Sequence, residues 1–162
     1  MKLADYLFIF LGVGIGLLLQ KQEPKAIAID VTPKAEVADT LTEWQQLQLA
    51  IAITESRCDP QATGAAQDAG ILQITPIYAR EASRLSSERT YSHNEAYDLE
   101  TSLEMFAVVQ GYHNPSHDID KAITLHNKAD WYKRRVLKNI EFIKQYEAAR
   151  RAVIDYELRK GI

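Results

Sequence analysis

The chain has 162 residues, of which 46% are hydrophobic and 25% charged, and it contains few glycines and prolines. This composition is typical of a globular protein rather than a disordered or fibrous one. The formal net charge of −3 gives no indication of nucleic acid as a partner. The single cysteine, Cys58, excludes an internal disulfide bond and a cysteine-rich zinc site. We interpret it as a small buried side chain rather than a nucleophile.

The N-terminus carries an apolar run over residues 6–19, which follows Lys2 and is followed by polar residues. As a helix this run would rise about 21 Å, less than the roughly 30 Å of a membrane's hydrocarbon core. Residues 1–19 are therefore predicted to be an export signal peptide, with an uncleaved N-terminal membrane anchor as the alternative. In either case the rest of the chain is expected to work outside the cytoplasm.

Residues 20–38 are polar, contain two prolines and lack a sustained periodicity, so they are predicted to be a linker. The folded domain is predicted to span residues 39–162. Its first helix is expected to begin with a capping box formed by Thr40 and Glu43. Apolar residues then recur at the three- and four-residue spacing of a helix with one buried face: Leu41, Trp44, Leu47, Ala50 and Ile51.

The rest of the domain is predicted to be helical as well. Helices are expected where a capping residue precedes a run of helical periodicity: 76–85 after Thr75, 99–112 after Asp98, 119–125 after Asp118, and from 130 to about 156. No alternation typical of strands interrupts this succession. The predicted fold class is therefore all-α, with a long C-terminal helix.

Glu55 ends the apolar run of the first predicted helix. A carboxyl group there is poorly solvated and close to the negative end of the helix, and both effects favour its protonated form. Such a group can protonate a glycosidic oxygen. On position alone, a solvated glutamate at a helix end is the simpler interpretation.

The residues around Glu55 change that interpretation, because two segments resemble the soluble lytic transglycosylase family. Its pattern reads E-S-x-x-x-P-x-A, then, after a short loop, A-x-G-L-M-Q-x-x-P; here residues 55–62 read ESRCDPQA and residues 69–76 read AGILQITP. A third segment, AITLHN at residues 122–127, stands where the family has A-x-x-A-Y-N. The resemblance covers residues 47–143 and implies a lysozyme-like transglycosylase domain.

The resemblance implies that Glu55 protonates the oxygen between N-acetylmuramic acid and N-acetylglucosamine in peptidoglycan. It would then accept the proton of the muramyl 6-hydroxyl, which closes a 1,6-anhydro ring without water. Ser56 would orient this glutamate or the N-acetyl group of the substrate. The remaining residues implied to bind the substrate or to line its cleft are Gly70, Gln73, His126, Asn127 and Tyr132. No cofactor is implied.

Two departures from the family pattern keep alternatives open. Asp68 stands before the Ala-Gly turn, and a second carboxylate across a cleft could activate water and make the enzyme a hydrolysing muramidase; a solvated loop residue is the simpler interpretation of Asp68. His126 stands where the family has tyrosine, which leaves room for a non-catalytic member that binds glycan or acts as a scaffold. His113 and His117 are separated by Pro115 and lack a third ligand, so no metal site is predicted.

The resemblance and the N-terminal segment together predict where the protein works. We expect an exported protein that meets the glycan strand of peptidoglycan in the periplasm, either free or anchored to the membrane and facing the cell wall. An envelope-spanning secretion or conjugation system, or a phage particle, would be the assembly that uses it. The basic C-terminal helix could meet a partner or a membrane, but a solvated helix face is the simpler interpretation.

Overall fold

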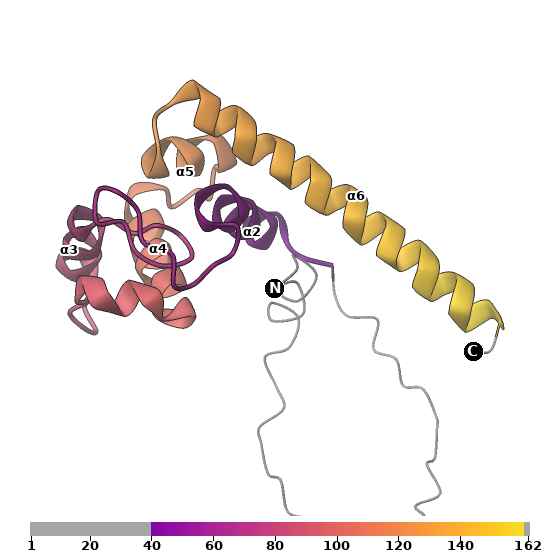
Figure 1. Cartoon of the computed structure of the whole chain (residues 1–162), viewed down its shortest axis with the longest axis horizontal. Coiled ribbons are helices and arrows are strands. Elements are labelled where there is room, and N and C mark those ends of the chain that lie inside the picture. The colour runs from indigo at the N-terminus through magenta and orange to yellow at the C-terminus, as the bar shows by residue number, and fades with distance from the viewer. Residues whose placement is uncertain (1–39, 161–162) are drawn as a thin grey trace, which may run out of the picture. The chain divides into compact units, whose positions relative to one another are not determined.

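The computed structural model describes residues 40–160 (Figure 1). The predicted signal peptide or anchor at residues 1–19 lies outside the described residues, as does the predicted linker at 20–38. Residues 41–160 lie in one compact unit. Its elements are α2 (Glu43–Ser56), α3 (Pro76–Leu85), the 3-10 helix η1 (His93–Tyr97), α4 (Leu99–His113), α5 (Ile119–His126) and α6 (Asp130–Lys160). Within residues 40–160, no helix is long and apolar enough to span a membrane.

The predicted all-α fold with a long C-terminal helix is confirmed. Three of the predicted helix starts are confirmed as well, because the N-cap side chains accept hydrogen bonds from the first turns as expected. Thr75 accepts from the amide of Tyr78, Asp98 from that of Thr101, and Asp118 from that of Lys121.

The predicted start of the first helix is wrong by two residues. Thr42, not Thr40, caps α2: its hydroxyl accepts from the amide of Gln45 at 3.2 Å, and the Gln45 side chain accepts from the amide of Thr42 at 2.8 Å. The reason lies far along the chain. The amide of Leu41 donates to the Glu147 carboxylate of α6 at 2.8 Å, which holds this residue outside the helix.

Helix α2 lies at the centre of the domain, packed against α6 and α5, while α3 packs against α4. It is buried on more than one face, because Leu47, Ala50 and Ile51 are inaccessible and Ala52 is 1% exposed. A helix with this burial is withdrawn from water along most of its length. Its last turn, which carries Glu55, is therefore fixed by the core.

The loop between α2 and α3 returns the chain to the end of α2. Arg57 and Cys58 adopt left-handed conformations with φ of 57° and 63°, which turns the chain sharply after the helix. Isolated β-bridges join Thr63 to Ala69 and Ala69 to Ile74. The second half of this loop is core: Ala69, Ile71, Leu72 and Ile74 are at most 3% exposed.

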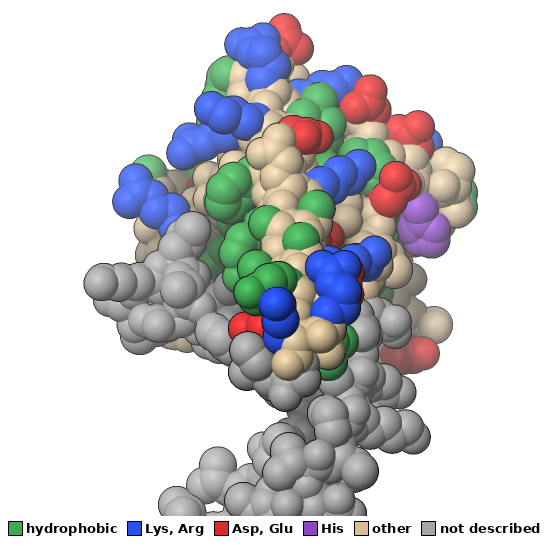
Figure 2. All heavy atoms as spheres, turned by 90° about the vertical axis from the view of Figure 1, so that its right-hand side faces the viewer, with side chains coloured by type: hydrophobic (Ala, Val, Ile, Leu, Met, Phe, Trp, Pro, Cys, Tyr) green, Lys and Arg blue, Asp and Glu red, His purple; other side chains and the backbone are tan. Residues whose placement is uncertain are grey.

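Beyond its contact with α2, α6 continues past the other helices (Figure 1). Large apolar side chains on this part are about half exposed: Phe142, Tyr146, Val153 and Tyr156. Figure 2 shows hydrophobic side chains beside Lys and Arg on the face of the molecule that carries this end of the helix.

Trp44, which was expected in the core, packs against Phe106 with a ring separation of 5.8 Å.

Gly70 occupies the most restricted place in the loop. Its φ is +72°, and a Cβ there would lie 1.8 Å from the carbonyl oxygen of Ala96 in η1. That distance is far below any van der Waals contact, and the opposing atom belongs to backbone. Only glycine fits, because it has no Cβ and adopts positive φ readily.

Gly70→Ala should therefore lower the free energy of unfolding by roughly 2–4 kcal/mol, since the chain must shift away from Ala96 and accept a strained φ. Gly111→Ala is the matched control: it lies in α4 with nothing within 4 Å of its Cβ position, and should raise stability by about 0.5–1 kcal/mol. Urea unfolding followed by circular dichroism measures both. Equal effects of the two substitutions would contradict the packing described for Gly70.

Candidate functional site

Glu55 lies in the last turn of α2 with a side chain only 20% exposed. Its Oε1 is 3.3 Å from Nε2 of His126, at the end of α5. The His126 side chain is only 5% exposed. The two residues that the sequence analysis placed in one site are therefore in contact.

The ring of His126 is packed among three aromatic side chains. Its centroid lies 5.9 Å from the ring of Tyr78, 6.0 Å from that of Phe106 and 6.1 Å from that of Tyr132. With Glu55, these residues come one from each α-helix of the described chain, α2 to α6. We call these five residues the Glu55 cluster.

Tyr132, near the start of α6, is 1% exposed. Burial raises the pKa of Tyr132 well above its ordinary value, and the nearby Glu55 carboxylate raises it further. Burial also raises the pKa of Tyr78, a shift that Gln110 partly opposes. Both hydroxyls therefore keep their protons at any physiological pH. The Tyr132 hydroxyl lies beside Glu55 without a well-aligned hydrogen bond to any described residue.

Ser56 joins the end of α2 to the loop that follows. Its hydroxyl donates to the carbonyl oxygen of Ile71 at 2.8 Å, with Ala52 as a second acceptor at 3.2 Å, and it accepts from the amide of Asp59 at 3.1 Å. The hydroxyl is thus used to fix backbone. The predicted contact of Ser56 with the N-acetyl group stays a prediction.

Gln73 also holds the loop together. Its amide nitrogen donates to the carbonyl oxygens of Ala62 at 3.1 Å and Gly70 at 2.8 Å. The backbone that approaches Gly70 is that of Ala96, so packing alone explains this glycine. The predicted sugar contacts of Gly70 and Gln73 stay predictions. Because both hydrogens of the Gln73 side-chain amide already have acceptors, a sugar could bind only to its amide oxygen.

Asp68 is half-buried in the same loop. Its carboxylate and the amide oxygen of Gln73 both lie against Gly64, where a Cβ would come within 2.6 and 2.7 Å of them. Among residues 40–160, Asp68 has no ion-pair partner within 4 Å, in contrast to Glu55. A role for Asp68 as a base stays a prediction.

Asn127 follows α5 directly and shapes the turn into α6. Its side-chain oxygen accepts from the backbone amide of Ala129 at 3.0 Å, and its backbone N–H donates to the carbonyl of Ile123 at 2.9 Å. This turn sets the separation of His126 and Tyr132, which lie on either side of it. The rings of His126 and Tyr132 are buried next to Glu55, and the predicted substrate contacts of His126, Asn127 and Tyr132 stay predictions.

Two members of the cluster, Phe106 and Tyr78, were not singled out from the sequence. Tyr78 lies four residues before Ala82, which is fully buried, so the period of α3 placed it on the inner face. Nothing in the local sequence distinguished it from an ordinary core tyrosine.

The remaining candidates are accounted for by packing or by surface pairs. Burial raises the pKa of the Cys58 thiol to about 11, which agrees with a buried filler. His113 pairs with Glu81 at 2.9 Å, and His117 packs on Trp44. Within residues 40–160, no three His, Cys, Asp or Glu side chains gather as metal ligands would.

A comparison with protein families adds an independent finding. The family model described as the transglycosylase SLT domain matches residues 34–122. The match includes Glu55 and Ser56, and it ends before His126 and Tyr132. No curated protein and no solved structure matches the chain significantly.

The buried tyrosines predict a loss of stability in alkali. A raised pKa in the folded state means that the stabilisation is complete below pH 10, near the ordinary tyrosine pKa of about 10, and is lost as pH rises further. Tyr132→Phe should therefore reduce the fall in unfolding free energy between pH 10 and 11.5, by up to about 1.4 kcal/mol per pH unit. Tyr146→Phe, at a position that is 45% exposed, is the control. Urea unfolding at several pH values across this range measures the effect. If the unfolding free energy of Tyr132→Phe falls with pH as steeply as that of the wild type, the prediction is wrong.

Proposed function

The chain belongs to the transglycosylase SLT domain family, and on that premise we propose that it is a lytic transglycosylase. Its domain has the all-α, lysozyme-like fold of this family. The proposed substrate is the glycan strand of peptidoglycan, cleaved at the β-1,4 bond between N-acetylmuramic acid and N-acetylglucosamine. The observation that carries the proposal is the position of one carboxyl group, Glu55, against the buried rings of His126 and Tyr132, with a fifth of its side chain still exposed.

In the first step Glu55 acts as general acid. Its proton passes to the glycosidic oxygen, the bond from that oxygen to C1 of the muramyl residue breaks, and an oxocarbenium-like centre develops at C1. Glu55 is left as a carboxylate.

In the second step Glu55 acts as general base. It accepts the proton of the muramyl 6-hydroxyl while that oxygen forms a bond to C1, which gives the 1,6-anhydro product. One proton leaves Glu55 and one returns, and no water is consumed. A single carboxyl group is sufficient for this cycle, because the nucleophile belongs to the substrate.

The loop 57–75 is proposed to form one wall of the substrate cleft. The Ser56 hydroxyl binds the loop to the end of α2 through Ile71, so a sugar bound along the loop would lie at a fixed distance from Glu55. Fixed geometry of this kind is worth several orders of magnitude in rate. We propose that the protein works outside the cytoplasm, where this substrate is found.

Purified peptidoglycan digested with the full chain should yield muropeptides that end in 1,6-anhydro-N-acetylmuramic acid, identified by mass spectrometry. Glu55→Gln should lower the rate of product formation by roughly 10²–10⁴-fold, the usual contribution of a general acid. Glu43→Gln, at the exposed start of the same helix, is the matched control and should keep full activity. Circular dichroism of each variant shows whether the fold is intact.

The masses also separate the competing mechanisms. Products with reducing ends would replace the proposal by the hydrolytic one, and Asp68→Asn should then abolish them. A Glu55→Gln variant as active as the wild type would overturn the assignment of the acid. A folded wild-type protein without any product would overturn the enzymatic proposal as a whole.

A further inference from the structure

The contact between His126 and Glu55 does more than bring two site residues together, because it determines where protons can lie. Nε2 of His126 faces two acceptors, the Glu55 Oε1 at 3.3 Å and the carbonyl oxygen of Leu72 at 3.1 Å. A carbonyl oxygen can only accept a hydrogen bond. Nε2 must therefore carry a hydrogen, which is bonded to the carbonyl of Leu72 and lies close to Oε1 of Glu55.

The other ring nitrogen is in the opposite situation. Nδ1 of His126 is buried and has no hydrogen-bond partner among the described residues. A hydrogen on this nitrogen would be a donor without an acceptor in an apolar environment, which is unfavourable. The arrangement favours the neutral ring with its single hydrogen on Nε2.

The groups around the ring support the same state. Tyr78 and Tyr132 face it from α3 and α6 as neutral phenols, Phe106 faces it from α4, and Glu55 is the charged or chargeable neighbour from α2. Within residues 40–160, no Lys or Arg lies within 4 Å of the Glu55 carboxylate. The hydrogen on Nε2 and the Tyr132 hydroxyl are thus the neutral donors closest to this carboxyl group.

We propose that His126 is a positioning residue, whose Nε2 hydrogen binds Oε1 of Glu55 and leaves the acidic proton of Glu55 on Oε2. This inference rests on the proposed function and deepens it, because it names the oxygen that protonates the substrate. His126 is too buried to bind the sugar itself, so the substrate contact predicted from the sequence is replaced by an indirect role.

This arrangement serves both steps of the reaction. Before cleavage, Oε1 is occupied as an acceptor, so the carboxyl group is held in one rotamer and presents the proton on Oε2. After the proton has left, the same Nε2 hydrogen lies against a carboxylate, and hydrogen bonds to charged groups are stronger than those to neutral ones. His126 therefore stabilises Glu55 most in the state that follows proton donation.

A pair of substitutions separates hydrogen bonding from packing. His126→Phe fills the ring space among Tyr78, Phe106 and Tyr132 but has no donor. His126→Gln cannot stack equally well, yet its amide nitrogen can take nearly the place of Nε2. His113→Gln is the matched control, because His113 forms a similar pair with Glu81 at the surface, with side chains 36% and 30% exposed.

If His126 positions Glu55, His126→Phe should lower kcat for release of anhydro-muropeptides by roughly 10- to 100-fold, with KM little changed. His126→Gln should restore much of the loss, and His113→Gln should behave as the wild type. Full activity of His126→Phe would overturn the proposal. So would an equal loss in the Phe and Gln variants when circular dichroism shows both to be folded.

A second measurement does not depend on activity. Nitrogen-15 NMR of the wild-type chain, with the His126 signal assigned through its loss in His126→Gln, reports which ring nitrogen is protonated. A neutral ring with its hydrogen on Nε2 at pH 7 is expected, and an Nδ1 hydrogen or an imidazolium would overturn the proposal. Because this readout needs no substrate, it tests the pair even if digestion fails and the proposed function is wrong.

Discussion

The structure depends on one constraint, which is that the carboxyl group of Glu55 must be held at the end of a buried helix while most of it is withdrawn from water. Such a group is costly unless donors replace the lost solvent. Here the replacements come from helices far along the chain: His126 of α5 contacts the carboxylate directly, and Tyr132 of α6 lies beside it as a neutral phenol. The short turn shaped by Asn127 keeps these two residues at a fixed separation.

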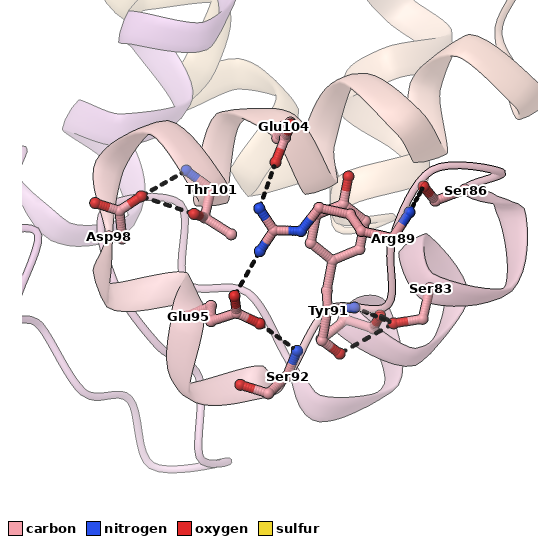
Figure 3. Close-up of polar contacts among 10 residues, drawn as sticks. Ser83, Ser86, Arg89, Tyr91, Ser92, Glu95, Asp98, Thr101 and Glu104 are labelled. Atoms are coloured by element: carbon pink, nitrogen blue, oxygen red, sulfur yellow. Dashed lines mark hydrogen bonds and ion pairs between the residues drawn. The ribbon is translucent and has the colours of Figure 1, made fainter.

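The support of Glu55 extends outward through backbone rather than through side chains that touch it. Arg89 bridges Glu95 of η1 and Glu104 of α4, and the Glu95 carboxylate also accepts from the amide of Ser92, as Figure 3 shows. This network fixes η1, and η1 in turn limits Gly70 through the carbonyl of Ala96. The carbonyl oxygens of the two residues after Gly70 accept hydrogen bonds: that of Ile71 from the Ser56 hydroxyl, and that of Leu72 from the His126 ring. A polar surface cluster is thus connected to the acid by a continuous path of packed atoms.

The parts of this fold that could be predicted from the sequence are those with local causes. The N-caps at Thr75, Asp98 and Asp118 were predicted correctly, because a capping side chain bonds an amide three residues away. The start of α2 was not, since two capping boxes overlap and a contact between Leu41 and Glu147 decides between them. The same limit applies to the site. Spacing predicted that Glu55 and His126 share a site, and the two are in contact, but Tyr78 and Phe106 pack on His126 from separate helices, which no local pattern encodes.

The surroundings of Glu55 also suit the proposed use of one carboxyl group as both acid and base. A carboxyl group that acts as acid and then as base must be able to adopt both its protonated and its ionised form. Neither a permanent cation nor bulk water should therefore contact it. A Lys or Arg in contact would favour the carboxylate and make the group a weaker proton acceptor in the second step. Purely apolar surroundings would favour the protonated form and make the group a weaker proton donor in the first step. Neutral donors lie between these extremes, because they bind the carboxylate without a full charge. Tyr132 stays neutral because burial raises its pKa, and Nδ1 of His126 has no hydrogen-bond partner among the described residues. The burial of these two rings is therefore as much a part of the proposed chemistry as the glutamate they enclose.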